Sequence, residues 1–97
     1  MMEYDFRYSE ENAKGLIEMW KGDDCLARMT YSRLDPNNII VDHTAVDPKA
    51  KGTGAGKRIV MEMVEWARKN HQKVLPICPF AKAIIEKHPE THDILRK

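Results

Sequence analysis

Three alternating glycines stand between two lysines in the segment 51–57, which reads Lys-Gly-Thr-Gly-Ala-Gly-Lys. Glycine lets the backbone turn its N–H groups toward an anion without a side chain in the way. Apolar residues with helical spacing follow directly, and the start of a helix adds unpaired N–H donors and a favourable dipole. This combination predicts a site for a phosphate-bearing ligand. The alternative interpretation is an ordinary flexible loop before a helix.

The glycine segment departs from two common phosphate-binding patterns. Lys51 stands where a Walker A loop has its first glycine, and Arg58 replaces the Ser or Thr that binds magnesium. The dinucleotide pattern G-x-G-x-x-G also fails, because neither a start at Gly52 nor a start at Gly54 places a glycine at the last position. These mismatches argue against a nucleoside triphosphatase and against a Rossmann-type site.

The segments before the glycines have the patterns of β-strands. Alternating or β-branched residues predict strands over 4–8, 16–20, 25–34 and 39–46. Polar residues with a glycine at 21–24 predict a hairpin, and the residues at 35–38 have turn chemistry throughout. We expect the β-branched run that begins at Ile39 to form the central strand.

Two helices and one more strand are predicted after the glycines. An apolar stripe predicts a helix from about Gly54 to Asn70; it consists of Ile59, Val60, Met63, Val64 and Ala67. The short strand 74–77 contains Pro76, which cannot donate to a ladder, so this strand should lack a neighbour on one side. A shorter helix should run from Pro79 to His88. The expected fold is α/β (α+β), with a twisted, mainly antiparallel sheet and the first helix packed on it.

Length, charge and cysteine content narrow the class of protein. The 97 residues suffice for a single domain, 1–97, with one modest core. A net charge of +1 gives no reason to expect binding to nucleic acid or to an anionic membrane. No apolar run approaches the ~20 residues that span a bilayer, and no signal-peptide pattern opens the chain. Cys25 and Cys78 form neither a disulfide scaffold nor a zinc-type pair. We expect a soluble cytoplasmic protein with free thiols and no metal.

The glycine segment and its surroundings resemble the acyl-CoA-binding signature of the GNAT N-acetyltransferase superfamily. That signature is Gln/Arg-x-x-Gly-x-Gly/Ala after the fourth strand; here Lys51, Gly54 and Gly56 follow a strand that ends in Ala-Val-Asp-Pro at 45–48. Lys51 keeps a positive charge but lacks the planar geometry of Arg. The predicted strand order also fits. Together with 43–46, the Cys-Pro-Phe at 78–80 and the His-Pro-Glu at 88–90 look like a small single-domain branch, so the resemblance covers 4–90.

The resemblance implies an acyltransferase that moves an acetyl group from acetyl-CoA to an amine. By analogy, backbone N–H groups of the glycine segment would hold the pyrophosphate, and the Val46 main chain would pair with the pantetheine arm. The implied cofactor-binding residues are Val46, Lys51, Gly52, Thr53, Gly54, Ala55, Gly56, Lys57 and Phe80. In the superfamily the fourth and fifth strands splay apart and the thioester lies between them. Pro76 suits that gap because it leaves no orphan N–H.

Cys78 and His43 are the candidate catalytic residues. Cys78 should lie at the mouth of the gap and just before a helix, whose positive end can lower the pKa of a thiol. It would act as proton donor to the departing CoA thiolate, as covalent acyl carrier, or only as a packing residue. Many superfamily members use a tyrosine as general acid in this helix, but none stands between Phe80 and Lys87. His43 would accept a proton from the incoming ammonium, or serve structure alone.

A second class of function fits the same residues. The segment 9–14 offers few residues where larger superfamily members have helices that shape the acceptor pocket. The acceptor cleft should therefore be open and shallow. The alternative function is a CoA-binding module without activity of its own, acting as a sensor or as a subunit whose partner supplies the acceptor site. The acceptor amine and the oligomeric state are left open by the sequence.

Overall fold

The computed structural model describes residues 4–96, which form one five-stranded sheet and two α-helices. The strands are β1 (Asp5–Glu11), β2 (Lys14–Lys21), β3 (Asp24–Asp35), β4 (Asn38–Val46) and β5 (Lys73–Pro76). The helices are α1 (Ala55–Lys69) and α2 (Pro79–Glu86), with 3-10 turns η1 (Pro48–Ala50) and η2 (Pro89–Ile94). The α-helices formed by residues 4–96 are too short or too polar to cross a membrane.

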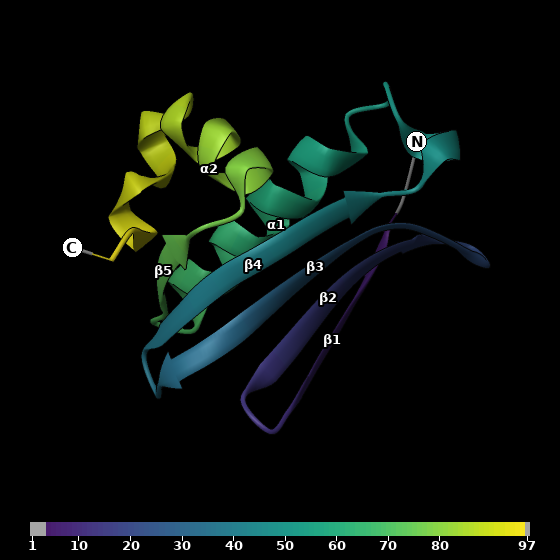
Figure 1. Cartoon of the computed structure of the whole chain (residues 1–97). Helices are drawn as coiled ribbons and strands as arrows, with labels where there is room; N and C mark the ends of the chain where they lie inside the picture. Colours follow the sequence, from purple (N-terminus) through teal and green to yellow (C-terminus); the bar gives the residue numbers. More distant parts are fainter. Residues whose placement is uncertain (1–3, 97) are drawn as a thin grey trace.

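The sheet has the order β1-β2-β3-β4-β5, and only the β4–β5 pair is parallel. Figure 1 shows α1 and α2 together above the sheet, on the same side of it. This arrangement confirms the predicted α+β fold, with its mainly antiparallel sheet and its helix after the glycine segment. Among residues 4–96, no strand pairs with the outer edge of β5, and the backbone there forms an isolated bridge between Val74 and Leu95, as expected for a strand that contains Pro76.

The position of β4 and several boundaries differ from the prediction. The middle strand is β3, so the prediction that the run from Ile39 is central was wrong. The apolar character of β4 comes from Ile39 and Val41, which are fully buried in the core. Strand β1 continues past Tyr8 to Glu11 because a two-residue turn at positive φ connects it directly to β2. Helix α2 ends at Glu86, since Pro89 disfavours helical backbone in the residue before it.

The core lies between the sheet and the helices. The predicted stripe of α1 is confirmed, because each of its residues is fully buried: Ile59, Val60, Met63, Val64 and Ala67. They pack in one cluster with sheet residues such as Ile17 and Met29 and with Ile85 of α2. Burial of a large apolar side chain contributes about 1.5–3 kcal/mol, so this stripe holds α1, and with it the glycine segment, in place.

The other face of the sheet has no helix packed on it among residues 4–96. Polar and aromatic side chains occupy this face; the Arg7 guanidinium, for example, lies 4.3 Å from the centre of the Trp20 ring.

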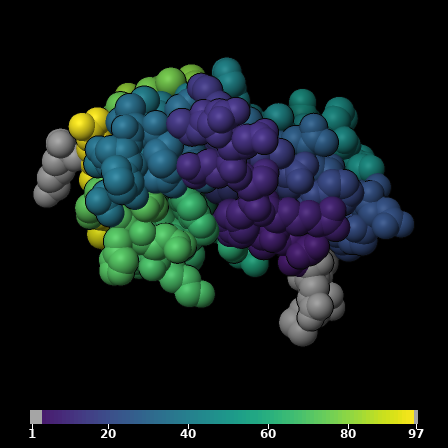
Figure 2. All heavy atoms as spheres, turned by 90° about the horizontal axis from the view of Figure 1, so that it is seen from below, coloured from purple at the N-terminus to yellow at the C-terminus, as the bar shows by residue number. Residues whose placement is uncertain are grey.

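Strand β1 connects the sheet edge to α1, because Tyr8 stacks on Trp66 with ring centres 5.9 Å apart. In the view from below, β1 in purple crosses the middle of the molecule beside the green end of α1 (Figure 2).

Replacing Met63 by alanine should destabilise the fold. The side chain is fully buried between α1 and the sheet, so truncation leaves a cavity and should lower the free energy of unfolding by about 2–5 kcal/mol. Met61→Ala is the matched control, because Met61 lies on the same helix and is partly exposed; it should cost clearly less. Urea denaturation followed by circular dichroism measures both. Equal losses would contradict the assignment of the buried stripe.

Candidate functional site

Strands β4 and β5 separate after only four paired residues on each. Asn38–Val41 pairs with Lys73–Pro76, and the ladder stops there. The carbonyl oxygen of Val41 accepts hydrogen bonds from the N–H groups of both Ile77 and Cys78, at 3.2 Å each. Among the described residues, β3 is the only strand beside β4 from Asp42 onward. The gap expected between the fourth and fifth strands is therefore present, and one edge of β4 borders it.

A β-bulge at Asp42 changes the direction of the side chains at this point. Val41 lies opposite Tyr31 and His43 opposite Thr30, so Asp42 is an extra residue in β4. Ser32 Oγ donates to Asp42 Oδ2 at 2.8 Å, which places the carboxylate on the face without helices. His43 shares that face because it pairs with Thr30. Two consecutive side chains thus point to the same side, and Thr44 returns to the helix side.

The glycine segment places unpaired donors at the start of α1. Gly52 and Gly54 have φ of 82° and 86°, the left-handed region that favours glycine. Gly54 is the N-cap of α1 and has no side chain to cap the helix. In the part of the chain that the structure describes, no acceptor bonds the N–H groups of Ala55, Gly56 and Lys57. These donors and the helix dipole favour an anion at this position.

A cavity of about 590 Å³, here called the loop cavity, lies between the glycine segment, β4 and α2. It is lined by Thr44, Ala45, Val46, Ala50, Lys51, Gly52, Gly54, Ala55, Gly56, Lys57 and Phe80. The structure thus brings together every predicted cofactor-binding residue except Thr53. The N–H and the hydroxyl of Thr53 both donate to the Ala50 carbonyl, so they are already occupied. Thr44 and Ala45 also line this cavity but were not among the predicted residues, although they adjoin Val46 on the strand.

Gly56 allows Phe80 to form a wall of the loop cavity. A Cβ added at Gly56 would lie 2.4 Å from Phe80 Cζ and 3.2 Å from Val46 Cγ2, both too close for an ordinary contact. The ring therefore packs directly on the first turn of α1. Phe80 keeps 45% of its surface exposed, which leaves an apolar surface beside the unpaired N–H groups.

Cys78 is the N-cap of α2 and lies at the end of the gap. Its side chain is only 4% exposed, and Sγ is 3.6 Å from Thr44 Oγ1. Burial alone would raise the pKa of the Cys78 thiol, but hydrogen bonds from the backbone of Ala81 and Phe80 and from Thr44 outweigh it. The pKa is therefore lowered. Cys78 lines none of the cavities described here.

A second cavity, of about 540 Å³ and here called the sheet cavity, is lined by the residues of β4 directly before those of the loop cavity. It is lined by Lys14, Gly15, Thr30, Tyr31, Asp42, His43, Ile77 and Pro79. Consecutive residues of β4 belong to different cavities, because His43 lines the sheet cavity and Thr44 the loop cavity. Cys78 stands between Ile77 of the sheet cavity and Phe80 of the loop cavity. The contact between Thr44 and Cys78 therefore joins two chain segments that each contribute residues to both cavities.

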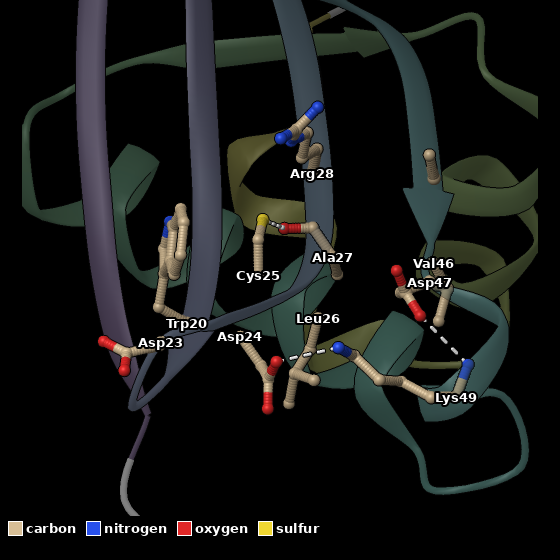
Figure 3. A pocket seen from close by; sticks show the side chains of 11 residues that line it. Trp20, Asp23, Asp24, Cys25, Leu26, Ala27, Arg28, Val46, Asp47 and Lys49 are labelled. Atoms are coloured by element: carbon tan, nitrogen blue, oxygen red, sulfur yellow. Dashed lines mark hydrogen bonds and ion pairs between the residues drawn. The ribbon is translucent and has the colours of Figure 1, made fainter.

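A third cavity, of about 400 Å³, lies where the β2–β3 hairpin meets the end of β4, and it shares Ala45 and Val46 with the loop cavity. Figure 3 shows Lys49 reaching across it to Asp24, a contact of 2.8 Å, while Asp47 accepts a bond from the Lys49 backbone. Lys49 and Asp24 thus form an ion pair across this cavity. Among residues 4–96, no group of three or more His, Cys, Asp or Glu could hold a metal ion.

Comparisons with known proteins place the chain in a family. The sequence profile of the GCN5-related N-acetyltransferases matches residues 16–94, so the chain belongs to this family. A GCN5-like candidate N-acetyltransferase from Staphylococcus aureus, solved by NMR, is 33% identical; the match covers 93% of this chain and 87% of the other, with a TM-score of 0.66. The resemblance to the superfamily is thereby confirmed. A comparison with curated proteins gave no match.

Two more distant structures share the fold. The ribosomal-protein-alanine N-acetyltransferase of Brucella melitensis is 16% identical over 80% of this chain and 62% of its own, with a TM-score of 0.67. An acetyltransferase of Bacillus subtilis, solved in complex with CoA, is also 16% identical, over 74% of this chain and 63% of its own, with a TM-score of 0.62. This chain thus spans less than two thirds of either protein.

The titration of Cys78 tests the hydrogen bonds at the gap. In a Cys25→Ser background, the Cβ carbon shift of Cys78 followed against pH should give a midpoint below that of an ordinary thiol. Thr44→Val removes the side-chain hydrogen bond to Cys78 but keeps the thiol buried, so the titration midpoint of Cys78 should rise. Thr44→Ser keeps the hydroxyl and should return the midpoint to its original value. The pKa of the Cys78 thiol is lower in the folded protein than in the unfolded chain. Ionisation of Cys78 therefore adds to the free energy of unfolding at pH values above the unfolded-state pKa, and this gain disappears as the pH falls through the folded-state pKa. A midpoint unaffected by Thr44→Val would refute the contact.

Proposed function

We propose that the protein transfers an acetyl group from acetyl-CoA to a primary amine. Membership of the GCN5-related N-acetyltransferases supports acyl transfer in general, and one protein of the same fold was solved with CoA bound. The observation that carries the proposal is that consecutive residues of β4, His43 and Thr44, line two different cavities just beyond the end of the β4–β5 ladder. One cavity is suited to the donor, and the other includes Asp42 and His43 on the face without helices, so two substrates would reach neighbouring residues of one strand.

The loop cavity suits the acyl donor. Its diphosphate would accept bonds from the N–H groups of Ala55, Gly56 and Lys57, with the charges of Lys51 and Lys57 nearby. The pantetheine arm would follow β4 from Val46 toward the gap, where the outer edge of the strand has no partner strand. Phe80 and Val46 supply an apolar wall for this arm. The thioester would then lie beside Thr44 and Cys78.

Direct attack of the amine on the thioester is the simplest chemistry for this arrangement. The amine nitrogen forms a bond to the acetyl carbon, and His43 takes the proton that the nitrogen loses. A β4 backbone N–H would stabilise the carbonyl oxygen as charge develops on it. The C–S bond then breaks, and CoA leaves as a thiolate that Cys78 protonates. A thiol whose pKa is lowered is a stronger acid than an ordinary thiol such as that of CoA, so this proton transfer is favourable.

The covalent alternative makes Cys78 the nucleophile, with an acetyl-cysteine intermediate. Cys78 is almost fully buried and lines neither cavity, which favours proton transfer over attack on a substrate carbon. Mass spectrometry after incubation with acetyl-CoA distinguishes the two routes. An adduct that Cys78→Ala abolishes would support the covalent route, and its absence in an active enzyme would support protonation.

Substitution of Gly54 tests the donor site. Gly54 and Gly22 both have positive φ, and no atom lies within 4 Å of a Cβ added to either, so Ala at each should cost about 1–2 kcal/mol of stability through backbone strain. Only Gly54 lines the loop cavity. We therefore expect Gly54→Ala to weaken acetyl-CoA binding at least tenfold in calorimetry, equivalent to about 1.4 kcal/mol, and Gly22→Ala to leave it unchanged. Equal effects would count against this donor site.

An assay of CoA release against polyamines, amino acids and peptides tests the transfer itself. The proposed function predicts that at least one amine accelerates CoA release, and that His43→Gln lowers kcat at an unchanged affinity for acetyl-CoA. Tight binding of acetyl-CoA with no release for any amine would instead support the CoA-binding module.

A further inference from the structure

The bulge at Asp42 gives the sheet cavity a carboxylate and an imidazole on neighbouring residues. In a regular strand Asp42 and His43 would point to opposite faces. Here the extra residue turns both side chains to the face without helices, where both line the sheet cavity. Bulges often re-aim side chains next to active sites. The cavity also borders Ile77 and Pro79, directly before and after Cys78.

The Asp42 carboxylate has no cationic partner among the residues that the structure describes. Ser32 Oγ donates to Oδ2 of Asp42 at 2.8 Å. The ammonium group of the nearby Lys14 donates to Ser32 Oγ, also at 2.8 Å, and not to the carboxylate. Glu10 and Glu18, on other strands of the sheet, are paired with arginines, Glu10 with Arg33 at 2.7 Å and Glu18 with Arg28 at 3.4 Å. Asp42 is partly buried and keeps Oδ1 available to a ligand.

The sheet cavity also has an apolar part to its lining. Ile77 is 58% exposed, the highest value among the large apolar side chains described, and it lines the sheet cavity together with Pro79. A ligand that fits this lining has one cationic end and a short apolar body. A primary alkylammonium ion has both, whereas a neutral arylamine has no charge for Asp42.

We propose that the sheet cavity is the acceptor site and that Asp42 binds the acceptor as an alkylammonium ion. This inference rests on the proposed function and names the acceptor class and the residue that recognises it. Once bound, the ammonium gives one proton to neighbouring His43, and the neutral nitrogen forms the C–N bond as the C–S bond to CoA breaks. Cys78 gives its proton to the CoA thiolate, and the second proton that the nitrogen loses returns to Cys78. Ser32 is a positioning residue, because its hydroxyl holds the carboxylate without touching the ligand.

Binding without turnover is the first test. NMR spectra of the CoA-loaded protein are recorded as n-butylammonium is added, with n-butanol as the uncharged probe. We expect the amide signals of Asp42 and His43 to shift with the ammonium and not with the alcohol. Asp42→Asn should abolish the shifts. Asp23→Asn is the control, because Asp23 lies in the β2–β3 turn outside the sheet cavity and should leave them unchanged (Figure 3). Shifts that persist in Asp42→Asn, or that never occur at these residues, would overturn the inference.

Kinetics with two acceptors is the second test. Asp42→Asn should raise the KM for n-butylamine about tenfold and leave the KM for aniline, which is neutral at neutral pH, and the KM for acetyl-CoA unchanged. Ser32→Ala keeps the carboxylate but frees it to move, so it should raise the KM for n-butylamine by a smaller factor. Equal changes for the two amines would overturn the inference. Ammonium binding at Asp42 without any CoA release would refute the proposed transfer and leave the cation site standing, so the two failures are distinguishable.

Discussion

The carbonyl oxygen of Val41 ends the β4–β5 ladder, and the whole candidate site depends on this event. By accepting the N–H groups of Ile77 and Cys78, it turns the chain out of the sheet just before α2 begins. The remainder of β4 then has β3 on one side only. A ladder that ran on would have covered the outer edge of Thr44 to Val46, and the loop cavity would lack one wall. The interruption also brings Cys78 to Thr44, 34 residues earlier in the chain.

The small size of the described fold determines how each face of the sheet can be used. Both helices are committed to one face, because the core is formed between them and the strands. The two-residue turn between β1 and β2 supplies no helix for the other face. That face is therefore open, and the bulge at Asp42 directs polar side chains to it. An open face is easy for a ligand to reach but encloses it little. Under the proposed function, recognition of charge by a single carboxylate is therefore a simple way to select a small acceptor.

Local patterns in the sequence sufficed for the features that depend on local physics. The alternating glycines predicted a backbone that can turn its N–H groups outward before a helix, and Gly52 and Gly54 lie in the left-handed region just before α1. The helical spacing from Ile59 to Ala67 predicted the buried stripe of α1. The position of Cys78 before a proline predicted a residue at a helix N-terminus, and Cys78 is the N-cap of α2. Each of these depends on residues a few positions apart.

Features that depend on pairing between distant segments were not predictable from one sequence. The bulge at Asp42 is a property of the register between β3 and β4, which no local pattern reveals. For the same reason Thr44 was not predicted as a neighbour of Cys78, nor Asp42 as a companion of His43. Thr53 stays a predicted cofactor residue from its place between glycines, and the sequence did not reveal that its N–H and hydroxyl donate to the Ala50 carbonyl. The β-branched segment from Ile39 was wrongly predicted to be the central strand of the sheet. A strand that is buried by helices and a strand in the middle of a sheet have the same apolar sequence pattern.

The most direct measurement is the set of intermolecular NOEs between acetyl-CoA and the protein. If the donor follows the free edge of β4, the methyl protons of the pantetheine arm should contact the Val46 methyl groups and the Phe80 ring, and the acetyl methyl should contact Thr44. NOEs from the acetyl group to residues of the third cavity, such as Trp20 or Leu26, with none to Thr44 or Phe80, would show that the donor does not use the gap between β4 and β5.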